Sequence, residues 1–127
     1  LFQNNGGTAV GKIDHGQSTT QYRTSSDYRL KENAVAISDG ITRLKTLKPY
    51  RFNFIAEPDK TVDGFFAHEV TAVPEAISGT KDEVDSNNNP IHQAMDYGKI
   101  TPLLTAALQE AIAEIETLKA RLDSAGL

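Results

Sequence analysis

Residues 104–122, LTAALQEAIAEIETLKARL, contain the strongest periodic pattern in this chain. Apolar side chains recur in this stretch at alternating intervals of four and three residues: Leu104, Leu108, Ala111, Ile115, Leu118 and Leu122. This alternation is typical of the seam of a coiled coil, in which each helix buries one stripe against its partners. The sequence therefore predicts a helix over residues 99–124 that packs against other copies of the chain. The alternative is an amphipathic helix that lies on its own domain.

The composition limits the classes of protein to which the chain can belong. With 127 residues, 39% hydrophobic and 7% aromatic, it has room for one thin hydrophobic core, which favours self-association. A net charge of −4 has the wrong sign for a nucleic-acid groove, and no apolar run is long enough to span a membrane. We therefore expect neither nucleic acid nor membrane as a partner. Because the chain begins at Leu1 rather than Met, we expect a terminal module of a longer protein.

Residues 1–25 are rich in Gly, Asn, Ser and Thr and have only scattered apolar positions. Residues 8–13 and 19–22 are typical of short strands, separated by turns at Asn5-Gly6 and at residues 14–16. Such a segment cannot form a core by itself. We expect a β-strand arm, the end of an upstream β-rich fibre, that completes a sheet supplied by the preceding chain or by sister copies.

Residues 26–96 predict a small globular unit. Apolar spacing indicates a helix over residues 38–47, with Ser38 as its N-cap and Pro49 beyond its end. Alternation over residues 50–55 predicts a strand, residues 64–67 predict a second strand, and residues 79–89 read as a solvent-exposed loop. The predicted fold class is α+β: a small mixed domain with an N-terminal strand arm and a long C-terminal coiled-coil helix.

Known metal and phosphate motifs are incomplete in this sequence. His68-Glu69 begins like a zinc-protease signature, but Ala72 stands where the second histidine ligand is required. Residues 85–96 have acidic and amide side chains at calcium-loop offsets, but Pro90 occupies the position that requires glycine. The chain also has no cysteine and no glycine-rich phosphate loop. We expect no metal and no cofactor.

The segment between the arm and the globular unit offers a hydroxyl and an amine five residues apart, Ser26 and Lys31. A serine hydroxyl needs a neighbouring base to attack at neutral pH. A lysine amine can be that base when burial lowers its pKa from about 10.4 toward 7–8. From spacing alone, a solvated surface turn is the competing interpretation.

Three further motifs follow Ser26–Asn33, SDYRLKEN: Tyr50–Phe54, YRFNF; Gly64–Val70, GFFAHEV; and Met95–Tyr97, MDY. In this order they resemble the C-terminal intramolecular chaperone domains of phage tailspikes, tail fibres and neck appendages, the endosialidase type. The resemblance spans residues 24 to about 122. It departs from the family at His68, where glutamine is frequent, and at Ala34, where a larger aliphatic residue is usual.

This resemblance implies a homotrimer that templates the folding of the β-helical fibre or spike preceding it and then cuts itself off. By resemblance, the scissile bond is Ser25-Ser26, Ser26 is the nucleophile, Lys31 is its general base, and Asp27 and Arg29 support the site. Residues 26–127 would be the chaperone domain. It would act in the infected host cytoplasm during virion assembly, and only the parent protein would stay in the virion tail or appendage.

Three alternatives to this function are open at the level of the sequence. The first is a trimeric cap that never cleaves, and the second is a receptor-binding fibre tip that uses the polar residues 79–93. The third is the related autoprocessing domain of a eukaryotic membrane-bound transcription factor. It is disfavoured because this chain has neither a membrane segment nor a basic region.

Overall fold

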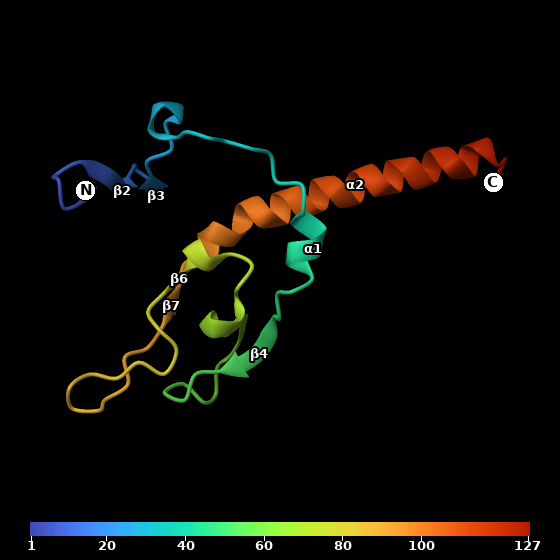
Figure 1. The fold of residues 1–127 in the computed structure, drawn as a ribbon. Coiled ribbons are helices and arrows are strands. Elements are labelled where there is room, and N and C mark those ends of the chain that lie inside the picture. Colours follow the sequence, from blue (N-terminus) through green and yellow to red (C-terminus); the bar gives the residue numbers. More distant parts are fainter. The chain divides into compact units, whose positions relative to one another are not determined.

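The computed structural model describes all 127 residues, which form two compact units, residues 1–36 and residues 37–127 (Figure 1). The first unit holds the strand arm and the Ser26–Asn33 motif. The second unit holds the remaining helices and strands and the hydrophobic core. The predicted domain boundary between residues 25 and 26 stays a prediction.

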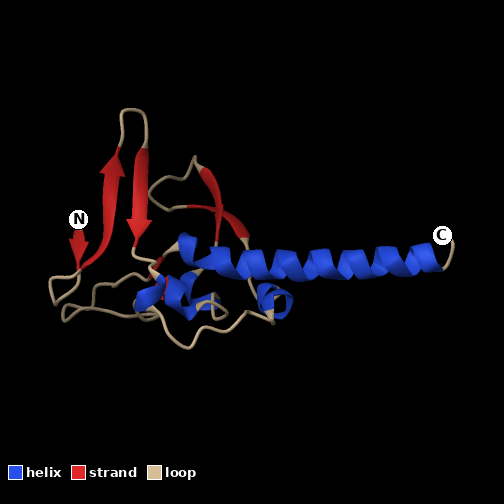
Figure 2. Cartoon of the chain, turned by 90° about the horizontal axis from the view of Figure 1, so that it is seen from above, coloured by secondary structure: helices blue, strands red, loops and turns tan.

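The first unit contains a three-stranded antiparallel sheet with the order β1 (Phe2–Gln3), β2 (Ala9–His15) and β3 (Thr20–Thr24), drawn as red arrows in Figure 2. The predicted strands pair with each other, whereas the sequence predicted pairing only with chain outside this segment. The turn also lies later than predicted, at residues 16–19, because pairing continues to His15 opposite Thr20. All residues of β3 are exposed, so the sheet has no core beneath it.

The first helix of the second unit, α1 (Gly40–Leu44), is shorter than the predicted 38–47. The N-cap position is Asp39, so the prediction of Ser38 is wrong. The helix begins at Gly40 because the carboxylate of Glu110 accepts hydrogen bonds from the amides of Gly40 and Ile41, at 2.6 and 2.9 Å. These two amides would otherwise lack partners at a helix N-terminus.

A two-stranded sheet follows, formed by β4 (Tyr50–Asn53) and β5 (Thr61–Gly64). The first strand is confirmed, and the second lies earlier than the predicted 64–67. Gly64 pairs with Tyr50, so the next residue of β5 would face Pro49, which has no N–H to donate to a ladder. The chain instead leaves the sheet and forms a 3₁₀ turn, η2 (Ala67–Glu69).

The middle of the second unit consists of short elements. A second 3₁₀ turn, η3 (Pro74–Ala76), leads into β6 (Ile77–Ser78), which pairs with β7 (Ala94–Met95). Residues 79–93 between these strands form an exposed polar loop, as predicted for residues 79–89, and one isolated bridge joins Val84 and Pro90. Two-residue strands are too short to leave an alternating pattern, which is why the sequence did not predict them.

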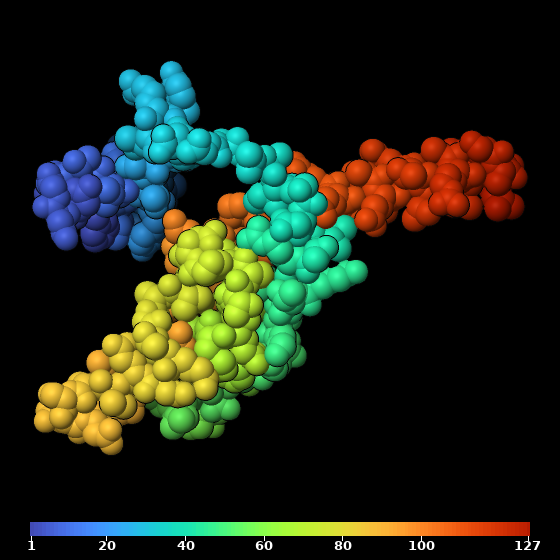
Figure 3. Space-filling model, viewed as in Figure 1, coloured from blue at the N-terminus to red at the C-terminus, as the bar shows by residue number.

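The C-terminal helix begins with a 3₁₀ turn, η4 (Tyr97–Ile100), and continues as α2 (Thr101–Ser124), a helix of 24 residues. This confirms the long helix predicted for residues 99–124. Its first turns pack against α1 and the core through Leu103, Ala106 and Ala107. The C-terminal half of α2 extends past the rest of the second unit (Figure 3). None of the helices combines the length and apolar character needed to cross a bilayer.

Candidate functional site

The Ser26–Asn33 motif begins directly after β3, at a residue that is fixed to the neighbouring strand. The amide of Ser25 donates to the carbonyl of Val10 at 3.0 Å, and its hydroxyl donates to the carbonyl of Ala9 at 3.3 Å. These two contacts hold the residue before Ser26 against β2. The peptide bond between Ser25 and Ser26 therefore lies where the paired sheet ends and the motif begins.

The motif itself folds as a capped 3₁₀ turn, η1 (Tyr28–Leu30). The carboxylate of Asp27 accepts a hydrogen bond from the amide of Arg29 at 2.9 Å, which caps the turn. It also accepts two hydrogen bonds from the Arg29 guanidinium, each at 2.9 Å. The backbone closes the turn when the amide of Lys31 donates to the carbonyl of Tyr28 at 3.1 Å. Asp27 and Arg29 thus fix the conformation of the segment that leads to Lys31.

The turn brings the two chemically interesting side chains of the motif together. The amine Nζ of Lys31 donates a hydrogen bond to the hydroxyl Oγ of Ser26 at 2.8 Å. This distance lies within the range required between a nucleophile and its general base. When the amine is deprotonated, the same separation allows the hydroxyl to donate to it. The arrangement can therefore move a proton from Ser26 to Lys31.

Asp27 and Arg29 form an ion pair within the motif, at 2.9 Å. The hydrogen bonds from the Arg29 side chain and amide lower the pKa of the Asp27 carboxyl below its usual value, and the nearby Lys31 amine acts in the same direction. The Asp27 carboxylate in turn raises the pKa of Arg29. Both side chains therefore stay charged at neutral pH, so the hydrogen bonds between Asp27 and Arg29 persist. We call this pair the clamp on η1.

Solvent reaches the whole motif in the single chain. Every residue from 26 to 36 is exposed, including the large apolar side chains of Tyr28 and Leu30, which are 82% and 70% exposed. Apolar side chains that point into water are candidates for burial in an assembly. The site thus has the Ser26 hydroxyl and the Lys31 amine in contact, but no cover that would exclude water.

The predicted seam forms a continuous exposed stripe along α2. Its leucines and isoleucine are 49–63% exposed, and Ala111 is half-buried. The buried face of the same helix, which includes Leu103 and Ala107, is a different stripe. None of the seam residues belongs to the buried core of the chain.

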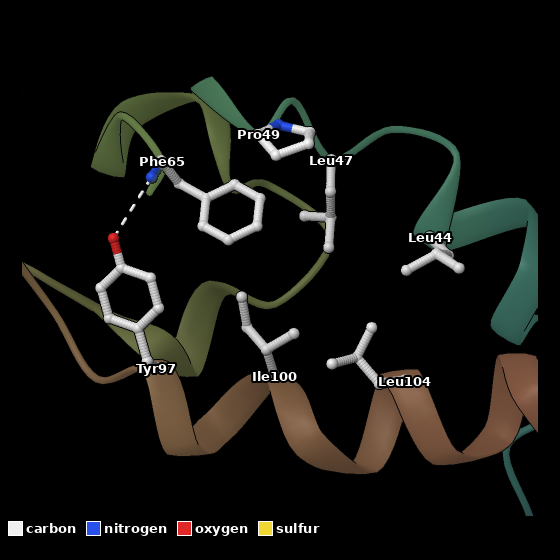
Figure 4. Close-up of a pocket in the computed structure, with 7 residues that line it drawn as sticks. All are labelled: Leu44, Leu47, Pro49, Phe65, Tyr97, Ile100 and Leu104. Atoms are coloured by element: carbon white, nitrogen blue, oxygen red, sulfur yellow. Dashed lines mark hydrogen bonds between the residues drawn. The ribbon is translucent and has the colours of Figure 1, made fainter. Parts of the chain in front are cut away.

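The unit of residues 37–127 also has a concave surface feature, which we name the apolar groove. It was not predicted from the sequence. It has a volume of about 400 Å³ and lies between α1, the start of β4 and the beginning of the C-terminal helix (Figure 4). Its lining side chains are Leu44, Leu47, Pro49, Phe65, Tyr97, Ile100 and Leu104. They come from three separate parts of the chain, so no local pattern marks them. The one available signal is the position of Tyr97, seven residues before Leu104.

Comparison with known proteins identifies a family that part of the chain matches. A search of curated proteins found no relative of this chain. Residues 26–78, however, match the model of a peptidase family described as Chaperone of endosialidase. This range begins at Ser26 and includes the first three of the four motifs quoted above, while Met95–Tyr97 and α2 lie beyond it. The family predicted from the motifs is therefore confirmed as a match to residues 26–78 of this chain.

Proposed function

We propose that the chain is a trimeric intramolecular chaperone that templates the folding of a phage fibre or spike and then releases itself by cutting the bond between Ser25 and Ser26. The observation that carries the proposal is the 2.8 Å contact between Lys31 Nζ and Ser26 Oγ at the first residue of the family match. Ser26 is the nucleophile and Lys31 is the general base. Asp27 and Arg29 support both by fixing the turn between them.

The proposed cleavage proceeds in two steps. Ser26 Oγ attacks the carbonyl carbon of Ser25 while Lys31 takes the hydroxyl proton, and the amide C–N bond breaks as Lys31 returns the proton to the nitrogen. The product is an ester between the Ser25 carbonyl and Ser26 Oγ. Water then hydrolyses it to a Ser25 carboxylate and a free Ser26 hydroxyl. Because the reacting groups belong to adjacent residues, no entropy is lost in bringing them together.

Assembly would switch the site on. Lys31 can accept a proton only as the neutral amine, and removal of water favours the neutral form of an amine. In the single chain the motif is exposed, with Tyr28 and Leu30 open to solvent. We infer that trimer formation buries these side chains, excludes water from Lys31 and so delays cleavage until three subunits have met.

The chaperone activity would come from the seam on α2. Long-range β pairing folds slowly and exposes strand edges, and three chains must be in register before a triple β-helix can close. A trimeric coiled coil raises the local concentration of the three attached arms and aligns them. Cleavage after closure removes the template, so the released fibre is kinetically trapped. This scheme places the domain in the infected host cell during assembly and not in the mature virion.

The proposal is tested by intact mass measurement of the full chain with its upstream arm, after purification and assembly. Self-cleavage predicts two products, residues 1–25 and residues 26–127. Ser26→Ala and Lys31→Ala are expected to abolish cleavage and leave the chain whole. Ser18→Ala and Lys12→Ala, which change the same residue types in the hairpin of the same unit, are expected to cleave like the wild type.

Two results would contradict the proposal in different ways. If the assembled wild type keeps its full mass, the domain is a permanent trimeric cap and the catalytic assignment is wrong. If sedimentation shows a monomer at every concentration, the trimeric template is wrong, whatever happens at the Ser25-Ser26 bond.

A further inference from the structure

The apolar groove is lined by side chains that are apolar except for one, Tyr97. Leu47, Phe65 and Ile100 point toward one another across it (Figure 4). Its one polar side chain, Tyr97, uses its hydroxyl to accept a hydrogen bond from the amide of Phe65 at 3.2 Å. A groove whose polar groups are already satisfied offers only hydrophobic burial to an occupant.

The groove is continuous with the seam. Leu104 is both a wall of the groove and the first residue of the seam. Tyr97, Leu104, Ala111 and Leu118 follow one another at intervals of seven residues, so one seam position runs back from α2 through η4 into the groove. Tyr97 and Leu104 are each about half exposed, at 52% and 49%. The stripe that faces partner helices therefore does not end where α2 begins.

The seam by itself is short for a stable assembly. Stable protein interfaces involve about 20–30 residues on each side. The seam supplies only six side chains over residues 104–122, well below that number. An assembly held by α2 needs additional apolar surface, and the groove offers such surface directly beside the first seam residue.

We propose that the occupant of the apolar groove is a second copy of this chain, whose first α2 turns cover the groove in the trimer. This inference rests on the trimer of the proposed function and extends its interface from the helix into the globular unit. The groove then contributes to trimer affinity, and it couples helix association to the position of α1 and of the segment that leads from α1 to β4, which line the groove opposite α2.

The test uses single cysteines, because the chain has none of its own. Leu44→Cys places a thiol in the groove at the end of α1, and Thr42→Cys places one on an exposed position of the same helix as a matched control. Each is made in the wild-type chain and in an Ile115→Glu background, in which the charge at the seam prevents association without disturbing the core. The rate of reaction with a soluble thiol reagent is then measured at a concentration at which the wild type is fully assembled.

The expected result is that the thiol at position 44 reacts about tenfold or more slowly in the assembled chain than in the Ile115→Glu chain, while the thiol at position 42 reacts equally in both. Equal rates at position 44 in a chain shown to be trimeric by sedimentation would overturn the groove inference and leave the trimer intact. A wild type that stays monomeric at all concentrations would overturn the groove inference together with the trimer. Circular dichroism of each cysteine variant establishes that it is folded before its thiol is assayed.

Discussion

Replacing Gly40 with alanine tests how tightly α1 is held on α2. A Cβ at position 40 would lie 2.6 Å from the amide nitrogen of Ala107 and 2.8 Å from the carbonyl carbon of Ala106. Both atoms belong to the backbone of α2, so no rotamer change relieves the clash. The two helices must separate, which also pulls the first amides of α1 away from the carboxylate of Glu110.

The size of this effect follows from the kind of contact. Overpacking of a tight interface costs about 1–3 kcal/mol. For a unit of this size, each kcal/mol lowers the melting temperature by roughly 4–8 °C. Without the clash the sign would be opposite, since alanine is favoured over glycine in a helix by about 0.5–1 kcal/mol. We therefore expect Gly40→Ala to melt several degrees below the wild type.

The assay is thermal unfolding followed by circular dichroism, at one fixed protein concentration because association shifts the transition. The matched control is Gly6→Ala in the N-terminal unit, where the nearest atom to the new Cβ is 3.4 Å away and no clash arises. A Gly40→Ala protein that melts at or above the wild-type temperature would refute the close packing of α1 on α2.

Two further predictions concern charged groups. Because Arg29 lowers the pKa of Asp27 in the folded chain, the clamp on η1 contributes stability above the ordinary aspartate pKa and loses it as the pH falls through the lowered value. Amide exchange at Arg29 should therefore accelerate, relative to its intrinsic rate, only at acid pH, and Arg29→Ala should raise the titration midpoint of Asp27. A midpoint that does not move would contradict the clamp. Glu110→Gln should cost about 1 kcal/mol in urea unfolding because it weakens the cap of α1, whereas Glu114→Gln, with the same charge change on an exposed turn, should cost little. Equal losses would show that Glu110 acts only through its charge.

The features that the sequence predicted correctly are local ones. The helix over 99–124 follows from the apolar spacing of Leu104 to Leu122, and the strand at Tyr50 follows from alternation over six residues. Ser26 and Lys31 lie five residues apart within one motif and are in contact, while their catalytic roles stay a prediction. In each case the residues that decide the structure lie within a few turns or one strand of each other.

The features that the sequence did not predict depend on distant residues. The start of α1 is set by Glu110, which lies 70 residues away, so Ser38 could not be excluded from local capping rules. The end of β5 is set by Pro49 on the opposite strand. The apolar groove is lined by residues from three separated segments. The one sign of it in the sequence is that Tyr97 lies seven residues before Leu104. Tertiary contacts overrode local propensity at each of these places.

The anchoring of Ser25 has a consequence for the proposed cleavage, because Ser25 would become the new C-terminal residue of the upstream part. Its amide and its hydroxyl are both held by carbonyls of β2. A cut immediately after Ser25 would give a new carboxyl terminus that is already hydrogen-bonded to β2, with no unpaired residues after it. If the bond after Ser25 is cut as proposed, these two hydrogen bonds would slow the removal of the new C-terminal residue by a carboxypeptidase.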